Sequence, residues 1–176
     1  MLFSHIFLLL VLTWRFFDTE TTLRKGRLLT VIPALRPQFE VSFDMYPLEK
    51  ISTWTGLLHM TVSGNDDFYR SRVPGIFYGN LNGVCCGSLL QIGFAINNHK
   101  NYIPRRPSVD IMRWTRVVVK QVLVNDDYVY MVLFNGIEQY RITNTETRLF
   151  KNVRVYVTNP WAGVFPGKIR NLTIIT

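Results

Sequence analysis

The sequence is poor in cysteine and histidine. Of its 176 residues only two are cysteines and three are histidines. Cys85 and Cys86 are adjacent, so they cannot staple distant strands together. They can form a vicinal disulfide, pair with another chain or stay as free thiols. The histidines stand far apart in the chain, which argues against a structural zinc site built from Cys and His ligands.

Acidic residues are also few. The chain has 12 Asp and Glu against 20 Lys and Arg, which gives a net charge of +8 and a pI near 9.8. A basic surface attracts polyanions such as sulfated glycans, anionic lipid or nucleic acid. No nucleic-acid-binding motif is present, so nucleic acid is the least favoured of these partners. The plain alternative is a soluble protein that happens to be basic.

The chain lacks an apolar stretch long enough for a membrane-spanning helix. Near the N-terminus an unbroken apolar run covers Ile6 to Leu12, which suits the hydrophobic part of a signal peptide. We therefore expect residues 1–22 to be a signal peptide and residues 23–176 to be one secreted, extracellular domain without a transmembrane anchor. No Lys or Arg precedes the run, and a first strand is the alternative. In a secreted glycoprotein, the sequon at Asn171 predicts N-glycosylation.

Helical periodicity is missing, whereas β-strand signals are frequent. The stretch from Trp114 to Ile142 contains three β-rich runs separated by the turn signals Asn125–Asp127 and Asn135–Gly136. Asn-Gly favours a tight hairpin because both residues tolerate positive φ. This stretch predicts an antiparallel meander. The fold class expected for the whole chain is therefore an all-β, antiparallel two-sheet sandwich or jelly roll.

Alternating apolar and polar residues predict the other strands. Phe39 to Tyr46 alternates cleanly, as a half-buried strand does. In total the pattern indicates eight to eleven strands, with a polar loop at residues 97–110. Further strands are expected near residues 28–31, 54–62, 73–78, 89–96, 150–157 and 168–175.

Five segments, taken in order, resemble the concanavalin A-like lectin and glucanase superfamily, and within it the laminin G-like and galectin-like sandwiches. The segments are Phe39–Asp44, Gly56–His59, Trp114–Val119, Tyr130–Gly136 and Pro166–Ile174. The resemblance covers about residues 38–175. It implies a jelly-roll fold and a binding role, and it raises the expectation of calcium at a rim of the sandwich.

The sequence departs from the active members of this superfamily. The galectin sugar-binding pattern is absent, and so is the Glu-x-Asp-x-Glu strand of the glycoside hydrolases. Glu40 and Asp44 share a strand face but lie four residues apart, about 13 Å along the backbone. Retaining glycosidases need two carboxylates about 5–5.5 Å apart. We therefore expect a protein that is not an enzyme, while a hydrolase with an unfamiliar site is an alternative.

The expected function is that of a lectin, which binds carbohydrate through cations and an exposed aromatic ring. Arginine suits sulfate groups, and an aromatic ring suits a sugar face. Trp161 can instead plug the end of the core. The predicted ligand-binding residues are Arg105, Arg106, Arg116, Lys120, Arg154 and Trp161.

Calcium is a further expectation, although no cofactor is required. Asn65, Asp66 and Asp67 offer oxygen ligands in a turn, where the same residues are also common for structural reasons. The expected partners are glycans or extracellular and cell-surface proteins, and oligomers are possible. An adhesion or structural module that binds proteins through a sheet face, with no sugar specificity, is the alternative function.

Overall fold

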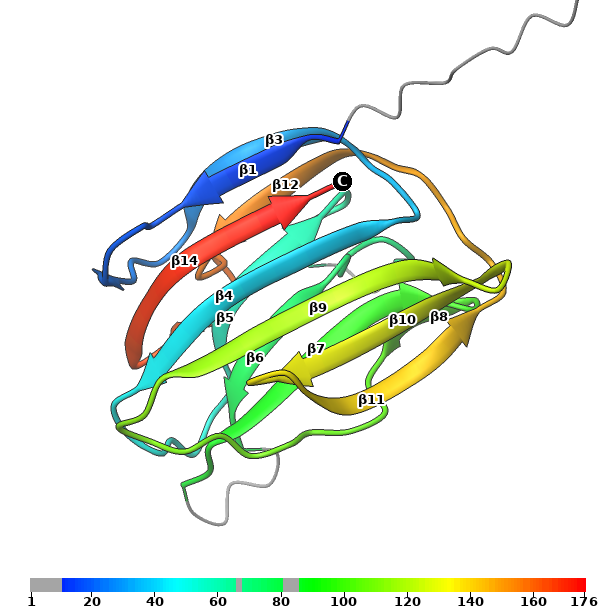
Figure 1. Cartoon of the computed structure of the whole chain (residues 1–176). Helices are drawn as coiled ribbons and strands as arrows, with labels where there is room; N and C mark the ends of the chain where they lie inside the picture. Colours follow the sequence, from blue (N-terminus) through cyan, green and yellow to red (C-terminus); the bar gives the residue numbers. More distant parts are fainter. Residues whose placement is uncertain (1–10, 66–67, 81–85) are drawn as a thin grey trace, which may run out of the picture.

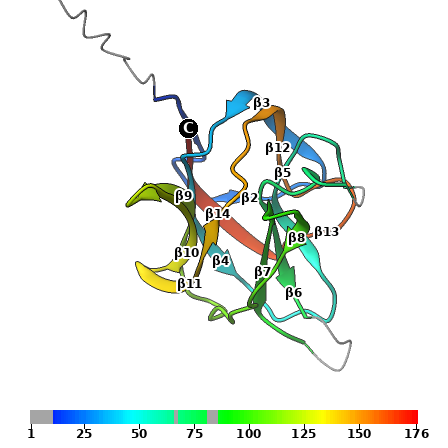
Figure 2. The same ribbon diagram turned by 90° about the vertical axis from the view of Figure 1, so that its right-hand side faces the viewer.

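The computed structural model describes residues 11–65, 68–80 and 86–176. This part of the chain holds fourteen strands and no helix. The strands form two sheets of seven strands each, which face each other as two layers (Figure 1; Figure 2). All strand pairs are antiparallel except one short parallel pair, β13 with β5. Within the described ranges, no helix has the length and apolar character needed to cross a membrane.

We call the sheet that faces the viewer in Figure 1 sheet A and the one behind it sheet B. Sheet A runs in the order β1-β14-β4-β9-β10-β11, with β2 also paired to β14. Its strands are β1 (Thr13–Phe16), β2 (Thr21–Thr22), β4 (Phe39–Pro47), β9 (Thr115–Val124), β10 (Asp127–Phe134), β11 (Ile137–Asn144) and β14 (Gly167–Ile175). Sheet B runs in the order β3-β12-β5-β6-β7-β8, with β13 beside β5. Its strands are β3 (Arg27–Leu35), β5 (Thr55–Thr61), β6 (Gly75–Gly79), β7 (Leu89–Ile96), β8 (His99–Tyr102), β12 (Phe150–Val157) and β13 (Gly163–Val164).

The predicted meander is confirmed as β9, β10 and β11, which are joined by two tight turns. Asn125 and Asp126 have φ of 48° and 68°, and Asn135 and Gly136 have φ of 49° and 81°. Two successive residues with positive φ give the turn whose twist matches that of the flanking strands. The Asn-Asp and Asn-Gly pairs thus set the register of the hairpins.

The core lies between the sheets and follows the predicted alternation. Val41, Phe43 and Met45 of β4 are fully buried, as are Val153, Val155 and Val157 of β12. The intervening residues of each strand face outward, because successive side chains on a strand point to opposite faces. The two layers therefore present one outer face each.

Aromatic rings join the two layers across the core. Phe94 of β7 lies 4.7 Å from Tyr130 of β10 and 5.5 Å from Phe39 of β4, measured between ring centroids. Phe150 of β12 meets Phe94 edge-on at 6.2 Å. Such pairs contribute about 0.5–1.5 kcal/mol beyond their burial. The cluster therefore fixes sheet B against sheet A.

Two predictions from the sequence are wrong. The pattern indicated eight to eleven strands, but the described residues form fourteen, because two-residue strands such as β2 and β13 are too short to show an alternating pattern. Residues 97–110 were expected to form a polar loop, but they contain β8, which pairs with β7. Asn97 and Asn98 both have positive φ and make the hairpin turn. The Asn97 side chain donates to Thr143 O and accepts from Thr145 N, both at 2.8 Å. Two successive asparagines thus form a hairpin turn here, as the Asn135-Gly136 pair does between β10 and β11.

Two short strands lie within the segment expected to be a signal peptide. Thr13–Phe16 pairs with the end of β14, and Thr21–Thr22 pairs with its start. Trp14, Phe16 and Phe17 pack against the hydrophobic core. A cleavage after residue 22 would remove both strands, whereas a cleavage before Thr13 would keep them. The signal peptide itself stays a prediction.

Candidate functional site

An aromatic and polar cluster lies on the outer face of sheet B, and we call it the Trp161 cluster. His59 of β5 faces outward, since its neighbours Leu58 and Met60 point into the core. Tyr156 of β12 is directly opposite His59 in the strand register. Trp161 follows β12 and packs on both, with ring centroids 5.4 Å from His59 and 5.7 Å from Tyr156. The cluster consists of His59, Tyr156, Asn159 and Trp161.

His59 is buried and held by two hydrogen bonds. Its Nε2 lies 2.7 Å from the carbonyl oxygen of Ser71, so Nε2 carries the proton and donates it. Nδ1 is then an acceptor and receives a hydrogen bond from Nδ2 of Asn159 at 3.2 Å. Burial, with a smaller contribution from the charge of Arg72, lowers the pKa of His59 to about 4, although the Ser71 hydrogen bond works in the opposite direction. The imidazole is therefore neutral at pH 7.

Asn159 links His59 to the loop that carries Trp161 through hydrogen bonds. Its Oδ1 accepts hydrogen bonds from the backbone N–H groups of Trp161 at 3.0 Å and Ala162 at 2.8 Å. The indole is held in place from beneath, yet it remains 45% exposed. The tryptophan thus lies on an outer face of the sandwich and does not plug the end of the core. A fixed, half-exposed ring can stack on an apolar surface of a ligand at little entropic cost.

A basic turn adjoins the Trp161 loop. The backbone N–H of Gly26 donates to Thr158 O at 2.6 Å, and Arg27 pairs with Val157 between β3 and β12. Gly26 has φ of 69°, a conformation that glycine adopts without strain. A hollow of about 570 Å³ lies beside this turn. We call it the basic groove; it is lined by Thr21, Thr22, Arg24, Lys25 and Arg27.

A second polar cluster lies on the outer face of sheet A around Asp44. Arg116 Nη1 contacts Asp44 Oδ1 at 3.1 Å, and Arg170 Nε contacts Asp44 Oδ2 at the same distance. Asn171 Nδ2 donates to Oδ2 at 2.8 Å. The guanidinium of Arg170 also lies 4.0 Å from the ring centroid of Trp114. Both carboxylate oxygens of Asp44 are therefore occupied by side chains of the same sheet.

The network determines the protonation of Asp44. Burial alone would raise the pKa of this carboxyl, but the hydrogen bonds from Asn171, Arg116 and Arg170 hold it below its ordinary value. A carboxylate that accepts from two guanidinium groups is a poor proton donor at neutral pH. Asp44 is therefore suited to a structural role and not to that of a general acid.

The six predicted ligand-binding residues do not gather at one place. Arg116 and Lys120 lie on the outer face of β9 in sheet A, as their spacing predicted. Arg116 is bound to Asp44, and Lys120 stands opposite Glu40 in the register. Arg154 faces outward on sheet B and donates to Val62 O, Arg106 donates to Gln91, and Arg105 is exposed. Arg154, two residues before Tyr156, lies on the same outer face of sheet B as Trp161. The Arg106 partner Gln91 also faces outward on sheet B, opposite Phe77 in the register.

The other predicted sites are only partly within the described residues. Asn65 is exposed in a turn, but Asp66 and Asp67 lie outside the described ranges, as Cys85 does. Cys86 is an exposed free thiol. In the described part, no three His, Cys, Asp or Glu side chains come together as a metal site. Calcium binding and the pairing of the cysteines stay predictions, and so does glycosylation of Asn171, which is exposed on β14.

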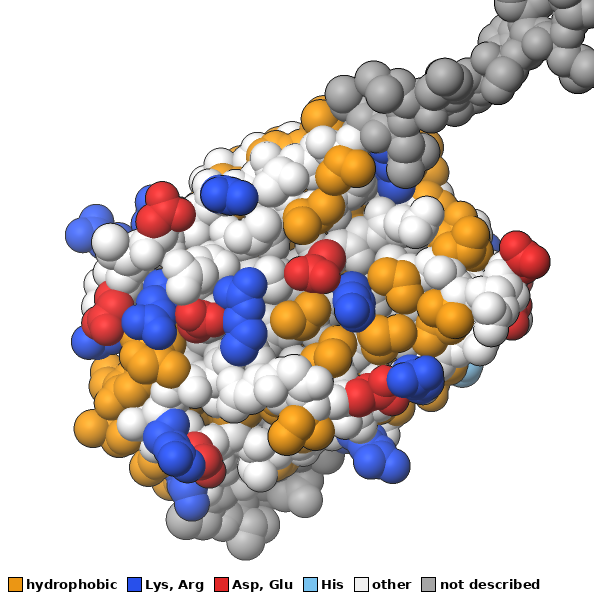
Figure 3. Space-filling view, in the orientation of Figure 1, with side chains coloured by type: hydrophobic (Ala, Val, Ile, Leu, Met, Phe, Trp, Pro, Cys, Tyr) orange, Lys and Arg blue, Asp and Glu red, His pale blue; other side chains and the backbone are white. Residues whose placement is uncertain are grey.

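The outer face of sheet A is partly apolar (Figure 3). Charged side chains of both signs are interspersed on it, and apolar side chains gather over β9 and β10. In the register, Val118 lies opposite Leu133, Lys120 opposite Met131, and Val122 opposite Val129. These outward apolar side chains are half-buried.

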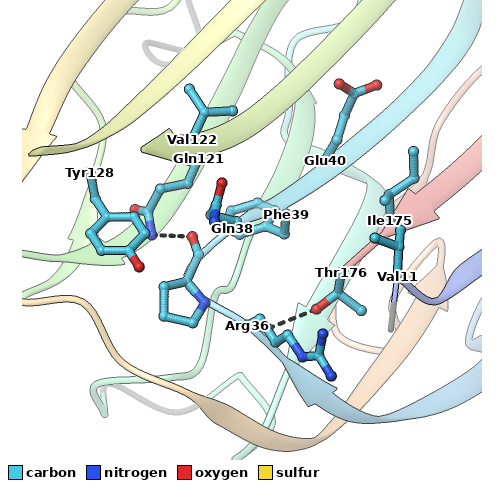
Figure 4. Close-up of a pocket in the computed structure, with 11 residues that line it drawn as sticks. Val11, Arg36, Gln38, Phe39, Glu40, Gln121, Val122, Tyr128, Ile175 and Thr176 are labelled. Atoms are coloured by element: carbon cyan, nitrogen blue, oxygen red, sulfur yellow. Dashed lines mark hydrogen bonds between the residues drawn. The ribbon is translucent and has the colours of Figure 1, made fainter. Parts of the chain in front are cut away.

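Another pocket, of about 390 Å³, lies at one end of the sandwich (Figure 4). Gln121 Nε2 donates to Pro37 O at 2.6 Å, and the Arg36 N–H donates to Thr176 Oγ1 at 2.8 Å. These hydrogen bonds tie β9 and β14 to the β3–β4 connection. None of the residues predicted to bind a ligand lines this pocket, whose walls are mostly apolar: Val11, Arg36, Pro37, Gln38, Phe39, Glu40, Gln121, Val122, Tyr128, Ile175 and Thr176.

Sequence reasoning missed His59, Asn159 and the basic turn. A lone histidine and a lone asparagine carry no motif, and their contact joins residues one hundred positions apart. Arg24, Lys25 and Arg27 were visible as a basic stretch. Only the glycine between them signalled a tight turn that would bring the three cations together.

No protein-family profile matches this chain, and no curated protein matches its sequence significantly. Solved structures do match its fold. A heptameric SAP-like pentraxin from Limulus polyphemus superposes with a TM-score of 0.55 at 13% identity, over 88% of this chain and 74% of its own. The CBM40 of the Ruminococcus gnavus IT-sialidase, solved with α2,3-sialyllactose, gives 0.53 at 12% identity, over 91% and 92%.

A Trypanosoma rangeli sialidase also matches, with a TM-score of 0.52 at 13% identity over 78% of this chain. This chain spans only 20% of that protein's length. The match therefore concerns one part of the sialidase. With two facing antiparallel sheets and these structural relatives, the chain has the concanavalin A-like jelly-roll fold that its sequence motifs resemble.

Proposed function

We propose that this protein is a secreted, non-catalytic carbohydrate-binding domain that holds a sugar ring on Trp161. The observation that carries the proposal is the exposure of an indole whose position is fixed. The ring is 45% exposed, while His59 and Tyr156 support it from the sheet. A large apolar ring held in water this way is a ready binding surface.

The support beneath the ring favours recognition over chance exposure. The Asn159 amide makes three hydrogen bonds, to His59 and to two backbone N–H groups of the loop. The hydrogen bond to His59 satisfies a buried ring nitrogen, the other two are partly buried, and together they hold the loop in one conformation. A preorganised site loses less conformational entropy on binding. Arg154 and Tyr156, on the same face, supply polar groups for sugar hydroxyls.

The fold relatives lend general support. One of them is a carbohydrate-binding module solved with a sialylated sugar. The finer proposal, that this chain prefers sulfated or otherwise anionic glycans in the extracellular space, rests on its net charge of +8 and on its leading apolar run.

The absence of catalysis is part of the proposal. Asp44, the acidic residue at the centre of the sheet A network, is held ionised by two arginines. Other acidic residues on the surface also form ion pairs: Asp110 with Arg113, Glu138 with Arg141, Glu146 with Arg148, and Glu20 with Lys168. Glycoside hydrolysis needs one carboxyl that stays protonated near neutral pH, and the environment of Asp44 works against that.

The test is a glycan-array measurement on the full chain and on two variants. Trp161→Ala removes the exposed ring, and Ile137→Ala removes an apolar side chain that is 70% exposed on sheet A. We expect Trp161→Ala to weaken binding to the best glycan about tenfold or more, equivalent to about 1.4 kcal/mol. Ile137→Ala should bind like the parent. Equal binding by all three proteins would overturn the assignment of the site to Trp161.

A second candidate function, protein adhesion, is favoured by the apolar side chains over β9 and β10. Half-exposed apolar pairs on an outward sheet face suit protein contacts better than sugar contacts. Met131→Lys places a charge at the centre of this surface. Loss of cell-surface binding in Met131→Lys, with binding retained in Trp161→Ala, would favour the adhesion module.

A further inference from the structure

The basic groove has the composition of an anion site. Three of its five lining residues are cations and the other two are threonines, whose hydroxyl groups can donate hydrogen bonds. No carboxylate lines it. Within the described ranges, Arg24 and Lys25 have no ion-pair partner. Arg and Thr side chains around a hollow suit the oxygens of a sulfate or carboxylate group.

The acidic residues near the groove do not neutralise its three cations. Asp18 and Glu20 lie in the preceding turn, and Glu20 is engaged by Lys168, Oε2 to Nζ at 2.8 Å. The guanidinium of Arg27 lies 4.9 Å from the ring centroid of Phe17, which orients this cation without neutralising it. The groove therefore keeps an excess of positive charge.

The basic groove and the Trp161 cluster are joined through the backbone. Gly26, at the centre of the basic turn, donates to Thr158 O, three residues before Trp161. Gly26 also packs against Pro160: a Cβ added to Gly26 would lie 3.5 Å from Pro160 Cβ, which is van der Waals contact. The loop that carries the exposed ring thus rests directly on the turn that carries the cations. A ligand longer than one sugar can contact both.

We infer that the basic groove binds the anionic substituent of an acidic oligosaccharide, a sulfate ester or a carboxylate, whose next sugars lie along the Trp161 loop. This inference rests on the proposed carbohydrate-binding function and adds the place on the structure where the anionic group of the glycan binds. Arg24 and Lys25 supply charge-assisted hydrogen bonds, while Thr22 supplies a neutral one. The Thr21 hydroxyl already donates to Thr19 O at 3.4 Å. Neutral chains use the Trp161 surface alone and bind more weakly.

The experiment compares three hexasaccharides by calorimetry across a salt series, with the full chain. A heparin hexasaccharide carries sulfate and carboxylate, a heparosan hexasaccharide carries only carboxylate, and a chitin hexasaccharide is neutral. The groove variant combines Arg24→Gln, Lys25→Gln and Arg27→Gln. A control variant with the same change in net charge combines Lys50→Gln, Lys100→Gln and Lys151→Gln, which are exposed elsewhere. Thermal unfolding checks that both variants fold.

We expect the groove variant to lose about tenfold or more in affinity for heparin for each charge-assisted hydrogen bond removed, and to show a shallower salt dependence. The control variant should change far less, and chitin binding should be the same in all proteins. An equal loss in both variants would overturn the inference, because net charge alone would explain it. If the groove variant also loses affinity for heparosan, the anion that the groove binds is a carboxylate. If its affinity for heparosan equals the parent's, the anion is a sulfate.

Failure of the inference is distinguishable from failure of the proposed function. If Trp161→Ala abolishes binding while the groove variant binds heparin like the parent, the sugar site stands and the groove is overturned. If the parent binds none of the three hexasaccharides, both are overturned. Backbone amide shifts at residues 21–27 on addition of heparin give a second measurement that needs no variant.

Discussion

The side-chain amide of Asn159 donates a hydrogen bond to Nδ1 of His59 across 3.2 Å. The direction follows from the other side of the ring, where Nε2 must donate to the carbonyl oxygen of Ser71. Oδ1 of Asn159 is then left to accept from Trp161 and Ala162. The buried, neutral His59 thereby fixes the Asn159 amide, and this amide in turn holds the loop that carries the exposed Trp161.

Protonation of His59 should destabilise the fold in a defined pH window. Its pKa falls from 6.5 in the unfolded chain to about 4 in the folded one, so the unfolded chain binds the extra proton first. Stability is complete above about pH 6.5 and declines as the pH falls toward 4, by about 3 kcal/mol in total. Urea unfolding between pH 7 and pH 4 measures this decline.

The contribution of His59 is isolated by His59→Gln, with His99→Gln as the control because His99 is exposed. We expect His59→Gln to be less stable at pH 7 but to vary less between pH 6.5 and 4. The carboxylates titrate in all three proteins and cancel in the comparison. A His59→Gln profile parallel to the parent's would contradict the assignment of the decline to this ring.

Asn159→Ala should release the Trp161 loop. The substitution leaves Nδ1 of His59 and two loop N–H groups without their partner, at a cost of about 1–3 kcal/mol for each group that stays buried. Glycan affinity should fall although Trp161 itself is unchanged, and the tryptophan emission should shift toward that of a solvated indole. Unchanged affinity would mean that the loop needs no support from Asn159.

Asp44→Asn should weaken sheet A modestly. The variant keeps the side-chain shape but removes the charge that Arg116 and Arg170 share. These arginines are 39% and 36% exposed, so water screens part of the attraction and the loss should be about 1 kcal/mol. Asp110→Asn, whose ion pair with Arg113 is largely exposed, should cost nothing measurable and serves as the control.

The pH dependence of the Asp44 effect has a definite sign. Because its folded pKa is lowered below 3.8, the carboxylate stabilises the fold above that value. The benefit is lost as the pH falls through the lowered pKa. The stability difference between the parent and Asp44→Asn should therefore be full at pH 5 and shrink below pH 3.8. A difference that grows on acidification would refute this account.

The sandwich was predictable because strand alternation and turn chemistry are local. Val153, Val155 and Val157 indicate their face by spacing alone, and Asn135-Gly136 indicates its turn by composition. The candidate site was less predictable, since its contacts are not local. Gly26 meets Thr158 and His59 meets Asn159 only after β3, β12 and β5, which are far apart in the sequence, pair as neighbours in sheet B. The sequence identified Trp161 as a candidate binding residue, but it did not identify His59 and Asn159, which hold Trp161 in place.

Strand β1 makes a prediction about where the mature chain begins. It pairs Thr13–Phe16 with Leu172–Ile175 of β14, and Trp14 and Phe16 pack against the core. Without β1 and β2, β14 becomes an unpaired edge strand that can pair with other chains. We expect a chain starting at Leu23 to be less stable than one starting at Thr13, by about 2–4 kcal/mol for two partly buried aromatic side chains, and to aggregate.

Two measurements check this. Urea unfolding of the two truncated chains gives the stability difference, and N-terminal sequencing of the chain secreted by expressing cells locates the cleavage. If the leading segment is a signal peptide, the sheet requires cleavage before Thr13, because later cleavage discards a paired strand together with its core contacts. Equal stability of the two truncated chains, or a mature chain that begins at Leu23, would show that β14 does not need β1 and β2 as neighbours.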